Sequence, residues 1–577
     1  MTMIRKNGFL KTAIVWVLLL AMLFSMAACG FAREASNEPG TVKFSEMQYE
    51  LVEESQVQEK IEALRQAGEG SNYKKFSKIY EEYNDYFAHV MTMSTLANLK
   101  YNEDVSDDTY SKESELMDEY TSDMIVAYYQ ICYKVLTDSP MSEKFKKDLT
   151  EEDIQDIMEG YKTYTDEYMA LRDAADKIAH EEQNLQATLT LTFEGAEYTM
   201  DELVDQYYKG KMTYDRIMQY QDEYYVKLCE ESGKLYLKLM PLYKQMAELA
   251  GFNSVAELQY KDLGRDYTPK EAEQYWAFVK SYVCPLYQSI TLLSSEEQKL
   301  QQIWESKSAL LNKLQTPMEE YFASISPKML EAYNYMNEYE LISSGYSTKR
   351  YPGSFTTRLM EYNEPYVFLN VSTKGYDYIG TLIHEFGHFF AFYLGGYEAT
   401  QVLDINEIQS QANELLFLDV IKNNYSEKEY NVLLKMQLGN MLYSIIDAAR
   451  QDEFQQKAFA QENPTYESLC ELYQSIDNSY GLPKESVVPA GAYWALYPHH
   501  FATPFYYISY GMSAISALDI FAISASDRQL GIDTYMKVAR VPAEVDYLEM
   551  LNDYGMHSPF EESLYKELSD TFKALLG

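Results

Sequence analysis

Residues 376–394, YDYIGTLIHEFGHFFAFYL, decide the fold, because apolar residues recur in them with the period of a helix. Gly395-Gly396 follows directly and is typical of a helix C-terminus. Within this predicted helix, the pattern HEFGH places His384 and His388 four residues apart. Side chains at that spacing lie on one helix face about one turn apart, so both imidazoles can bind a single metal ion.

Glu385 lies between the two histidines and supplies a carboxylate beside the predicted metal position. A carboxylate there can accept a proton from the attacking water, which is the general base that metal-assisted hydrolysis requires. The alternative is that both histidines pack in a helix core without a metal. The chain has only 7 histidines, so this pattern seldom arises by chance, and it predicts one zinc ion per chain.

A hydrolytic zinc site has three protein ligands and one open position, so a third ligand is expected. Residues 404–419, DINEIQSQANELLFLD, predict a second helix whose polar stripe includes Glu407 and Glu414. The connection between His388 and this stripe is long enough for a turn and a return, so the stripe can face the histidines. Glu407 is then the third ligand, and Glu414 orients a ligating imidazole. The alternative is that the stripe is only the solvated face of the helix.

A further segment, WALYPHHFATPFYYISYGMS, carries two adjacent histidines, His499 and His500, before a run of aromatic residues. Thr503-Pro504 is typical of a helix N-terminus, so we expect the histidines in a loop and Tyr506 and Tyr510 on one helix face. An imidazole N–H and a phenol O–H can stabilise the oxyanion of a tetrahedral intermediate. The alternative is a helix that packs its aromatic side chains in the core.

A short run rich in β-forming residues, PYVFLNV at 365–371, precedes the HEFGH helix. Before it, residues 350–354, RYPGS, have the composition of a turn. The run predicts a strand beside the metal-binding helix in an otherwise helical chain. Its open edge suits an extended peptide that pairs as the next strand, and the alternative is a structural hairpin arm.

Most of the remaining sequence has the periodicity of amphipathic helices. Residues 43–185 contain few glycines and prolines and predict a layer of helices. Residues 186–198 alternate polar and apolar side chains on both sides of a Glu-Gly turn, which predicts a β-hairpin. Thr199 and Glu202 have the spacing of a capping box that begins the next helix.

The N-terminus has the pattern of a bacterial lipoprotein signal peptide, with a basic start, an apolar segment and small residues before Cys29. We expect residues 1–28 to be removed, Cys29 to carry a lipid, and residues 29–42 to form a polar tether. The alternative is an uncleaved membrane anchor. Either arrangement puts the body at the extracytoplasmic face of a bacterial cell membrane. That body is expected to consist of an N-terminal helical domain over 43–200 and a helical catalytic domain over 201–577.

Charge and cysteine usage exclude several classes of function. The formal net charge of −40 repels nucleic acid and anionic lipid, so nucleic acid is not an expected partner. The cysteines after Cys29 are too widely spaced for a metal or redox motif and too few for a disulfide framework. We expect them to be buried thiols, with one bridged pair as the alternative. A monomer is the expected oligomeric state.

Together these residues resemble the oligoendopeptidase F and thimet oligopeptidase family of zinc metallopeptidases. HEFGH is similar to the family's metal motif, and Glu407 followed by Ser410 and Glu414 is similar to its third-ligand helix. Weaker likeness covers most of the mature chain. Two features of the sequence depart from the family, since Ile508 stands where relatives often have tyrosine and Ala502-Thr503 replace aromatic residues after the histidine. A lipid anchor is also unlike the usual cytosolic members.

The resemblance implies roles for residues that spacing alone leaves open. His500, with Tyr510 and Tyr506, is similar to the region that stabilises the transition state. The segment from PGSF to PYVFLN resembles the lining of the family's substrate cleft. The substrate-binding residues implied in this way are Gly353, Ser354, Phe368 and Asn370.

The resemblance also implies a mainly α, two-lobed zincin-type fold with a deep substrate channel and a small β element beside the active-site helix. Such a channel admits short, unfolded oligopeptides as substrates. We therefore expect a zinc-dependent endopeptidase with Glu385 as its general base. The alternatives are a zinc exopeptidase of carboxypeptidase or dipeptidyl type, and a peptide-binding lipoprotein without hydrolytic activity.

Overall fold

The computed structural model describes residues 40–306, 310–347, 349–372, 375–396, 399–400, 402–481 and 489–576. The predicted signal peptide, Cys29 and most of the tether therefore lie outside the described residues. The chain divides into two compact units, and each is built from segments that are far apart in the sequence. Among the described residues, unit 1 comprises 166–288 and 442–511, and unit 2 comprises 40–165, 289–441 and 512–576.

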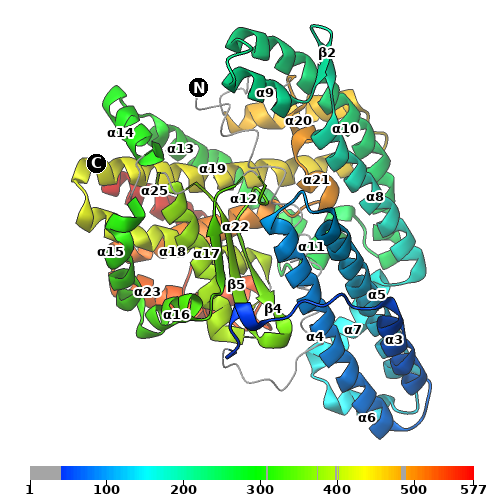
Figure 1. Cartoon of the computed structure of the whole chain (residues 1–577). Helices are drawn as coiled ribbons and strands as arrows, with labels where there is room; N and C mark the ends of the chain where they lie inside the picture. The colour runs from blue at the N-terminus through cyan, green and yellow to red at the C-terminus, as the bar shows by residue number, and fades with distance from the viewer. Residues whose placement is uncertain are drawn as a thin grey trace. The chain divides into compact units, whose positions relative to one another are not determined.

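Helices make up most of both units, which confirms the expected fold class (Figure 1). The helices of unit 1 are α8 (Asp166–Thr188), α9 (Met200–Tyr208), α10 (Tyr214–Ala250), α11 (Val255–Asp262), α12 (Pro269–Phe278), α20 (Tyr466–Tyr480) and α21 (His499–Ala502). Three helices contribute residues to both units, namely α13 (Cys284–Thr291), α19 (Glu427–Phe459) and α22 (Ile508–Ser526).

Unit 2 contains a group of helices before unit 1 in the sequence and a second group after it. The first group is α3 (Glu54–Gly68), α4 (Tyr73–Glu103), α5 (Asp108–Asp138), α6 (Ser142–Asp148) and α7 (Glu151–Gly160). The second is α14 (Ser295–Ser306), α15 (Leu310–Ile325), α16 (Pro327–Glu338), α17 (Asp377–Gly395), α18 (Leu403–Asn424), α23 (Arg528–Val538), α24 (Tyr547–Tyr554) and α25 (Glu562–Leu576).

Two local predictions are confirmed in unit 1. Strands β1 (Leu191–Phe193) and β2 (Ala196–Tyr198) form the expected antiparallel hairpin. Thr199 and Glu202 then form the expected capping box at the start of α9. The expected domain boundary at residue 200 differs from the division into units, because α8 and α10 pack against each other across it.

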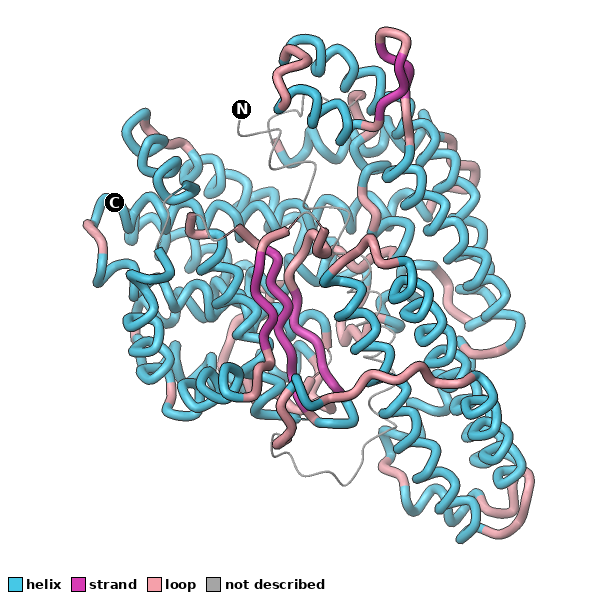
Figure 2. The backbone as a smooth tube through the Cα atoms, viewed as in Figure 1, coloured by secondary structure: helices cyan, strands magenta, loops and turns pink. Residues whose placement is uncertain are grey.

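Unit 2 contains a three-stranded sheet with the order β3-β5-β4 (Figure 2). Strand β5 (Glu364–Asn370) pairs in parallel with β3 (Ile342–Gly345) and antiparallel with β4 (Phe355–Leu359). The predicted strand thus exists, but it is the central strand of a sheet. Its first six residues are buried, since α17 packs against β5 and β4.

The most apolar described helix is a core element. Helix α22 is long enough to span a membrane, and its most apolar stretch of 18 residues has a mean hydropathy of 1.4, but 78% of that stretch is buried inside the protein. The four described cysteines, Cys132, Cys229, Cys284 and Cys470, are free thiols.

His557 connects the C-terminal part of unit 2 to α22 and provides a pH-dependent contribution to stability. Its Nδ1 lies 3.0 Å from Oδ1 of the buried Asp519, and its Nε2 lies 3.5 Å from Glu567. The hydrogen bond to Asp519 raises the pKa of His557 above its usual value. Because this pKa is raised on folding, the stabilisation is present at acidic pH and is lost as pH rises through the folded-state pKa.

We therefore expect His557→Gln to lower the melting temperature by about 1–2 °C at pH 6 and by less at pH 9. Glutamine can still donate a hydrogen bond to Asp519 but cannot carry the charge. Thermal unfolding of both proteins between pH 5 and pH 9 measures the difference. A deficit that grows with pH would contradict this role.

Candidate active site

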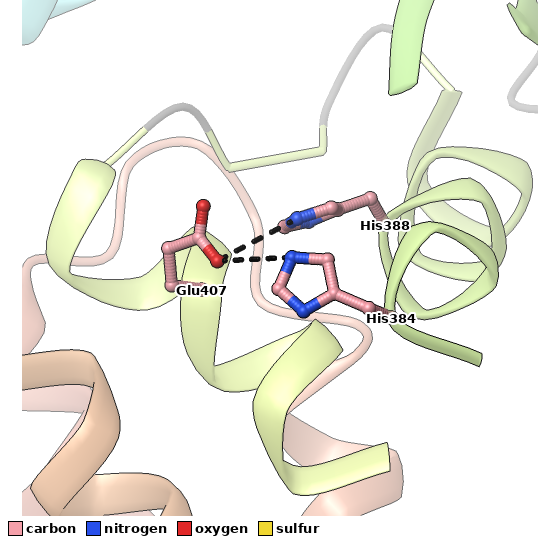
Figure 3. A group of neighbouring side chains, drawn as sticks. All are labelled: His384, His388 and Glu407. Carbon is pink, nitrogen blue, oxygen red and sulfur yellow. Dashed lines mark ion pairs between the residues drawn. The ribbon is translucent and has the colours of Figure 1, made fainter. Parts of the chain in front are cut away.

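Three predicted metal ligands converge in unit 2. The side chains of His384 and His388 project from α17 toward Glu407, which projects from α18 (Figure 3). Glu407 Oε2 lies 3.3 Å from His384 Nε2 and 3.8 Å from His388 Nε2. All three ligand atoms lie within 4.8 Å of one another. The polar stripe of the second helix therefore faces the histidines and is not a solvated face.

The two helices are fixed to each other at close range beside the ligands. A Cβ atom at Gly387 would lie 2.6 Å from the carbonyl oxygen of Gln409 and 2.7 Å from Cα of Ser410, so only glycine fits there. Asn413, which is fully buried, donates its side-chain N–H to the carbonyl of Ile383 at 2.7 Å. These contacts set the distance across which Glu407 reaches the histidines.

Two further side chains orient the ligands. His384 Nδ1 lies 2.7 Å from Glu414 Oε1, so its N–H can donate to that carboxylate while Nε2 points toward Glu407. Ser410 donates its hydroxyl to Glu407 Oε2 at 3.1 Å. A carboxylate on the outer nitrogen of a ligating histidine fixes the ring and increases its basicity. Glu414 thus lies where the sequence predicts it.

The electrostatics favour the protonation states that bind metal at two of the ligands. Burial raises the pKa of Glu407, but the hydrogen bond from His384 and the charges of both histidines outweigh it and lower that pKa to about 2. Burial lowers the pKa of His388 to about 4. Burial also lowers the pKa of His384, but hydrogen bonds with Glu407 and Glu414 raise it well above its usual value. Glu407 is therefore ionised and His388 neutral at physiological pH.

This donor set fits zinc. Zinc binds imidazole nitrogen and carboxylate oxygen at about 2.0–2.2 Å, so ligand atoms around a tetrahedral ion lie roughly 3.3–3.6 Å apart. The separations of Glu407 Oε2 from the two histidine nitrogens, 3.3 Å and 3.8 Å, are close to that range. The fit follows from the distances, from two imidazoles and one carboxylate as donors, and from the oriented ring of His384.

Glu385 lies on the same helix as the histidines and is 5% exposed. Its Oε2 accepts a hydrogen bond from the hydroxyl of Thr356 on β4 at 2.8 Å, and its carbonyl lies 2.9 Å from the same hydroxyl. Burial raises the pKa of Glu385 to about 7. A carboxylate with that pKa can accept and return a proton near neutral pH. Sequence reasoning missed Thr356, because its role depends on the pairing of β4 with β5.

We expect Glu414→Ala to weaken zinc binding by roughly 10–100-fold, because His384 then loses the acceptor that orients its ring. Competition with a chromogenic chelator measures the zinc dissociation constant. Asp419→Asn is the matched control, since Asp419 lies on the same helix but pairs with Arg528 at 2.8 Å. An unchanged dissociation constant in Glu414→Ala would contradict the assigned role.

The four predicted substrate-binding residues lie in and around the sheet. Phe368 is fully buried, and its ring stacks on Phe355 with centroids 5.1 Å apart. The side chain of Asn370 donates to the carbonyl of Tyr351 at 2.6 Å, and its backbone N–H donates to Ser354 Oγ at 3.1 Å. Gly353 follows Tyr351 in the same loop. In this structure Phe368 and Asn370 organise the loop and the sheet.

The histidine and tyrosine segment belongs to unit 1, and its local structure differs from the expected one. His499 and His500 lie in the one-turn helix α21, and α22 begins only at Ile508. Phe505 has a φ of 67°, in the left-handed region, so the chain cannot continue as a helix from Pro504. Tyr506 therefore precedes α22 instead of lying within it.

The two histidines have different environments. His499 stacks on Tyr506 with centroids 5.7 Å apart and meets Tyr510 edge-on at 6.0 Å. His500 has no exposed surface and lies against the rings of Phe454 and Tyr497, at 5.5 Å and 5.4 Å. Burial lowers the pKa of His500 to about 3, so it stays neutral. His499, and not His500, forms a cluster with the two predicted tyrosines.

Comparison with sequence families agrees with this geometry. The profile of the Peptidase M3 N-terminal domain matches residues 44–164, and that of Peptidase family M3 matches residues 334–570. Together they cover more than half of the chain and include all three predicted metal ligands. Among curated proteins, none matches the chain at a significant level.

Solved structures share the fold over nearly the whole chain. A structure described as oligoendopeptidase F is 21% identical, with a TM-score of 0.73 over 93% of this chain and 99% of that one. PZ peptidase A with an inhibitor is 20% identical, with a TM-score of 0.73 over 92% and 99%. The M32 carboxypeptidase of Deinococcus radiodurans is 11% identical, with a TM-score of 0.53 over 91% and 100%.

Proposed function

The chain belongs to peptidase family M3, and from this we propose that it is a zinc-dependent endopeptidase of short, unfolded oligopeptides that acts outside the cytoplasm. The observation that carries the proposal is the convergence of His384, His388 and Glu407 beside the buried carboxylate of Glu385. A peptide-binding protein without hydrolytic activity would not need that carboxylate.

His384, His388 and Glu407 would hold the metal. When bound, it would act as a Lewis acid that polarises the scissile carbonyl and activates water. Glu385 then accepts the proton of the attacking water and returns it to the leaving amine. The hydroxyl of Thr356 holds the Glu385 carboxylate in place. The raised pKa of Glu385 suits both proton transfers, from the water and to the amine, at neutral pH.

For the oxyanion we propose hydrogen bonds from His499 and Tyr510, with Tyr506 as the stacking partner of His499. Support comes from the contacts of His499 with both tyrosines and from the enclosure of His500 among aromatic rings. The family resemblance gives this segment the same role. Removing one such donor from an enzyme typically lowers kcat by about 10²–10³-fold.

Cleavage of internal bonds is supported by the resemblance in fold to oligoendopeptidase F, which is stronger than that to the carboxypeptidase. A quenched fluorescent peptide blocked at both ends separates the alternatives, with products mapped by mass spectrometry. We expect internal cleavage that a zinc chelator abolishes and added zinc restores. Removal of single C-terminal residues from unblocked peptides only would indicate a carboxypeptidase, and binding without cleavage would indicate an uptake protein.

The signal-peptide pattern before Cys29 supports the proposed location outside the cytoplasm. We propose that a lipid on Cys29 anchors the enzyme to the extracytoplasmic face of the membrane. Fractionation of cells that carry Cys29→Ser tests this, because the variant should leave the membrane fraction. Retention equal to that of the wild-type protein would rule out the lipid as the anchor.

A further inference from the structure

The turn between α21 and α22 has a strained backbone at a bulky residue. Phe505 has a φ of 67°, and a side chain other than glycine seldom adopts this conformation. Such strain persists only where the surrounding structure fixes it, and it is frequent at functional sites. The turn lies between His499 and Tyr510, so its conformation sets how these two side chains meet.

Side chains from the loop between α11 and α12 and from α19 bind both backbone groups of Phe505. Nη2 of Arg265 donates to the Phe505 carbonyl at 2.8 Å. The Phe505 N–H donates to Oε1 of Gln455 at 2.9 Å. The ring of Phe505 is fully buried, with its centroid 5.7 Å from that of Phe459 and 6.1 Å from that of Tyr260. The turn is thus held by two polar contacts and by packing.

Arg265 also connects the turn to the helix that follows it. The same Nη2 lies 2.9 Å from Ser509 Oγ in the first turn of α22. Arg265 is 7% exposed, and its guanidinium lies over the ring of Tyr260, 4.5 Å from the centroid. The fully buried Asp452 accepts a hydrogen bond from the Tyr260 hydroxyl at 2.8 Å and supplies a negative charge near the guanidinium of Arg265. Burying an arginine is costly, so its place at this turn points to a specific role.

The aromatic cluster depends on this turn for its arrangement. His499 precedes the turn, Tyr506 follows Phe505 directly, and Tyr510 lies in the first turn of α22. His499 stacks on Tyr506 at 5.7 Å, and Tyr506 meets Tyr510 at 5.2 Å. If the Phe505 peptide rotated out of the left-handed region, Tyr506 would leave the ring of His499.

We propose that Arg265 and Gln455 are positioning residues, which hold the Phe505 turn so that His499 and Tyr510 are prearranged to bind the oxyanion. This inference rests on the oxyanion role given above to His499 and Tyr510. Neither Arg265 nor Gln455 has to touch the substrate. Their effect is therefore expected in the transition state and not in substrate binding.

The test is a double-mutant cycle in the full-length, zinc-loaded enzyme. We expect Arg265→Gln to lower kcat by about 10²-fold, as a misplacement of the order of 1 Å can do, with KM within about threefold and zinc content unchanged. We expect Arg265→Gln combined with Tyr510→Phe to lose no more activity than the stronger single variant, since both act through one contact.

A phosphinic peptide and a thiol peptide provide a second readout. Only the phosphinic peptide presents a tetrahedral oxyanion, so its inhibition constant should rise with the loss in kcat while that of the thiol peptide stays unchanged. Gln455→Leu repeats both measurements with the Arg265 contacts intact, in case Arg265→Gln does not fold. Tyr480→Phe is the matched control, because it removes a buried hydrogen bond to Glu453 on α19 and should lower stability only.

The outcomes separate this inference from the proposed function. If Tyr510→Phe lowers kcat but the losses of the two variants multiply, the positioning role is overturned and the oxyanion role stands. If Tyr510→Phe has the kcat of the wild-type enzyme, both roles are overturned, although zinc-dependent cleavage stands. Equal weakening of both inhibitors by Arg265→Gln would also overturn the positioning role.

Discussion

Glu385→Gln is expected to lower kcat/KM for a blocked peptide by about 10²–10⁴-fold while the protein keeps its zinc. Glutamine has nearly the same shape as glutamate and can still accept the hydroxyl of Thr356, so the helix and the ligands should stay in place. The amide cannot accept a proton from water at neutral pH. The loss should therefore fall mainly on kcat, because the missing interaction forms only on the way to the transition state.

Zinc content and melting temperature are the controls for Glu385→Gln. Thr356→Val is a second, milder variant, since it leaves the carboxylate of Glu385 and removes only the hydroxyl that orients it. It should lower kcat less than Glu385→Gln does. Glu385→Gln with full zinc and activity within tenfold of wild type would show that another group is the base.

Glu407→Ala is expected to weaken zinc binding and to abolish cleavage at equimolar zinc. The loss of affinity should exceed the roughly 10–100-fold expected for Glu414→Ala, because Glu414 only orients a ligand. Glu407→Ala leaves two imidazoles, and three protein ligands are the usual number in a catalytic zinc site. It also removes one of the two acceptors of the Ser410 hydroxyl, which keeps the backbone carbonyl of residue 407.

Metal analysis after dialysis and the zinc dependence of peptide cleavage measure this effect. Excess zinc should restore part of the activity, because His384 and His388 remain. Glu407→Asp is the matched variant, since its shorter carboxylate keeps the donor type and should retain more zinc than Glu407→Ala. A Glu407→Ala protein that keeps one tightly bound zinc would place the third ligand elsewhere.

The convergence of the candidate metal ligands could be predicted from the sequence, because its determinants are local and periodic. His384 and His388 need only one helix, and Glu407 and Glu414 need only the next, so helical spacing decides which side chains share a face. The capping box at Thr199 is equally local. At Gly387 the two helices lie in close contact, although the residues involved are more than 20 positions apart in the sequence. No sequence pattern predicts this contact.

Features that depend on pairing between distant segments could not be predicted in the same way. Strand β3 has the sequence ISSG, which carries little β signal, and it forms only because β5 pairs with it. Thr503-Pro504 has the composition of a helix start, but the left-handed Phe505 delays α22 to Ile508. The contacts of Arg265 and Gln455 determine that conformation, and both lie far away in the sequence.

A crystal structure of the zinc-soaked protein, with anomalous data collected on both sides of the zinc absorption edge, tests the metal centre most directly. We expect one strong peak in unit 2, about 2.0–2.2 Å from Nε2 of His384, Nε2 of His388 and a carboxylate oxygen of Glu407. A zinc peak bound by other side chains, or a carboxylate of Glu407 turned away from the ion, would contradict the account.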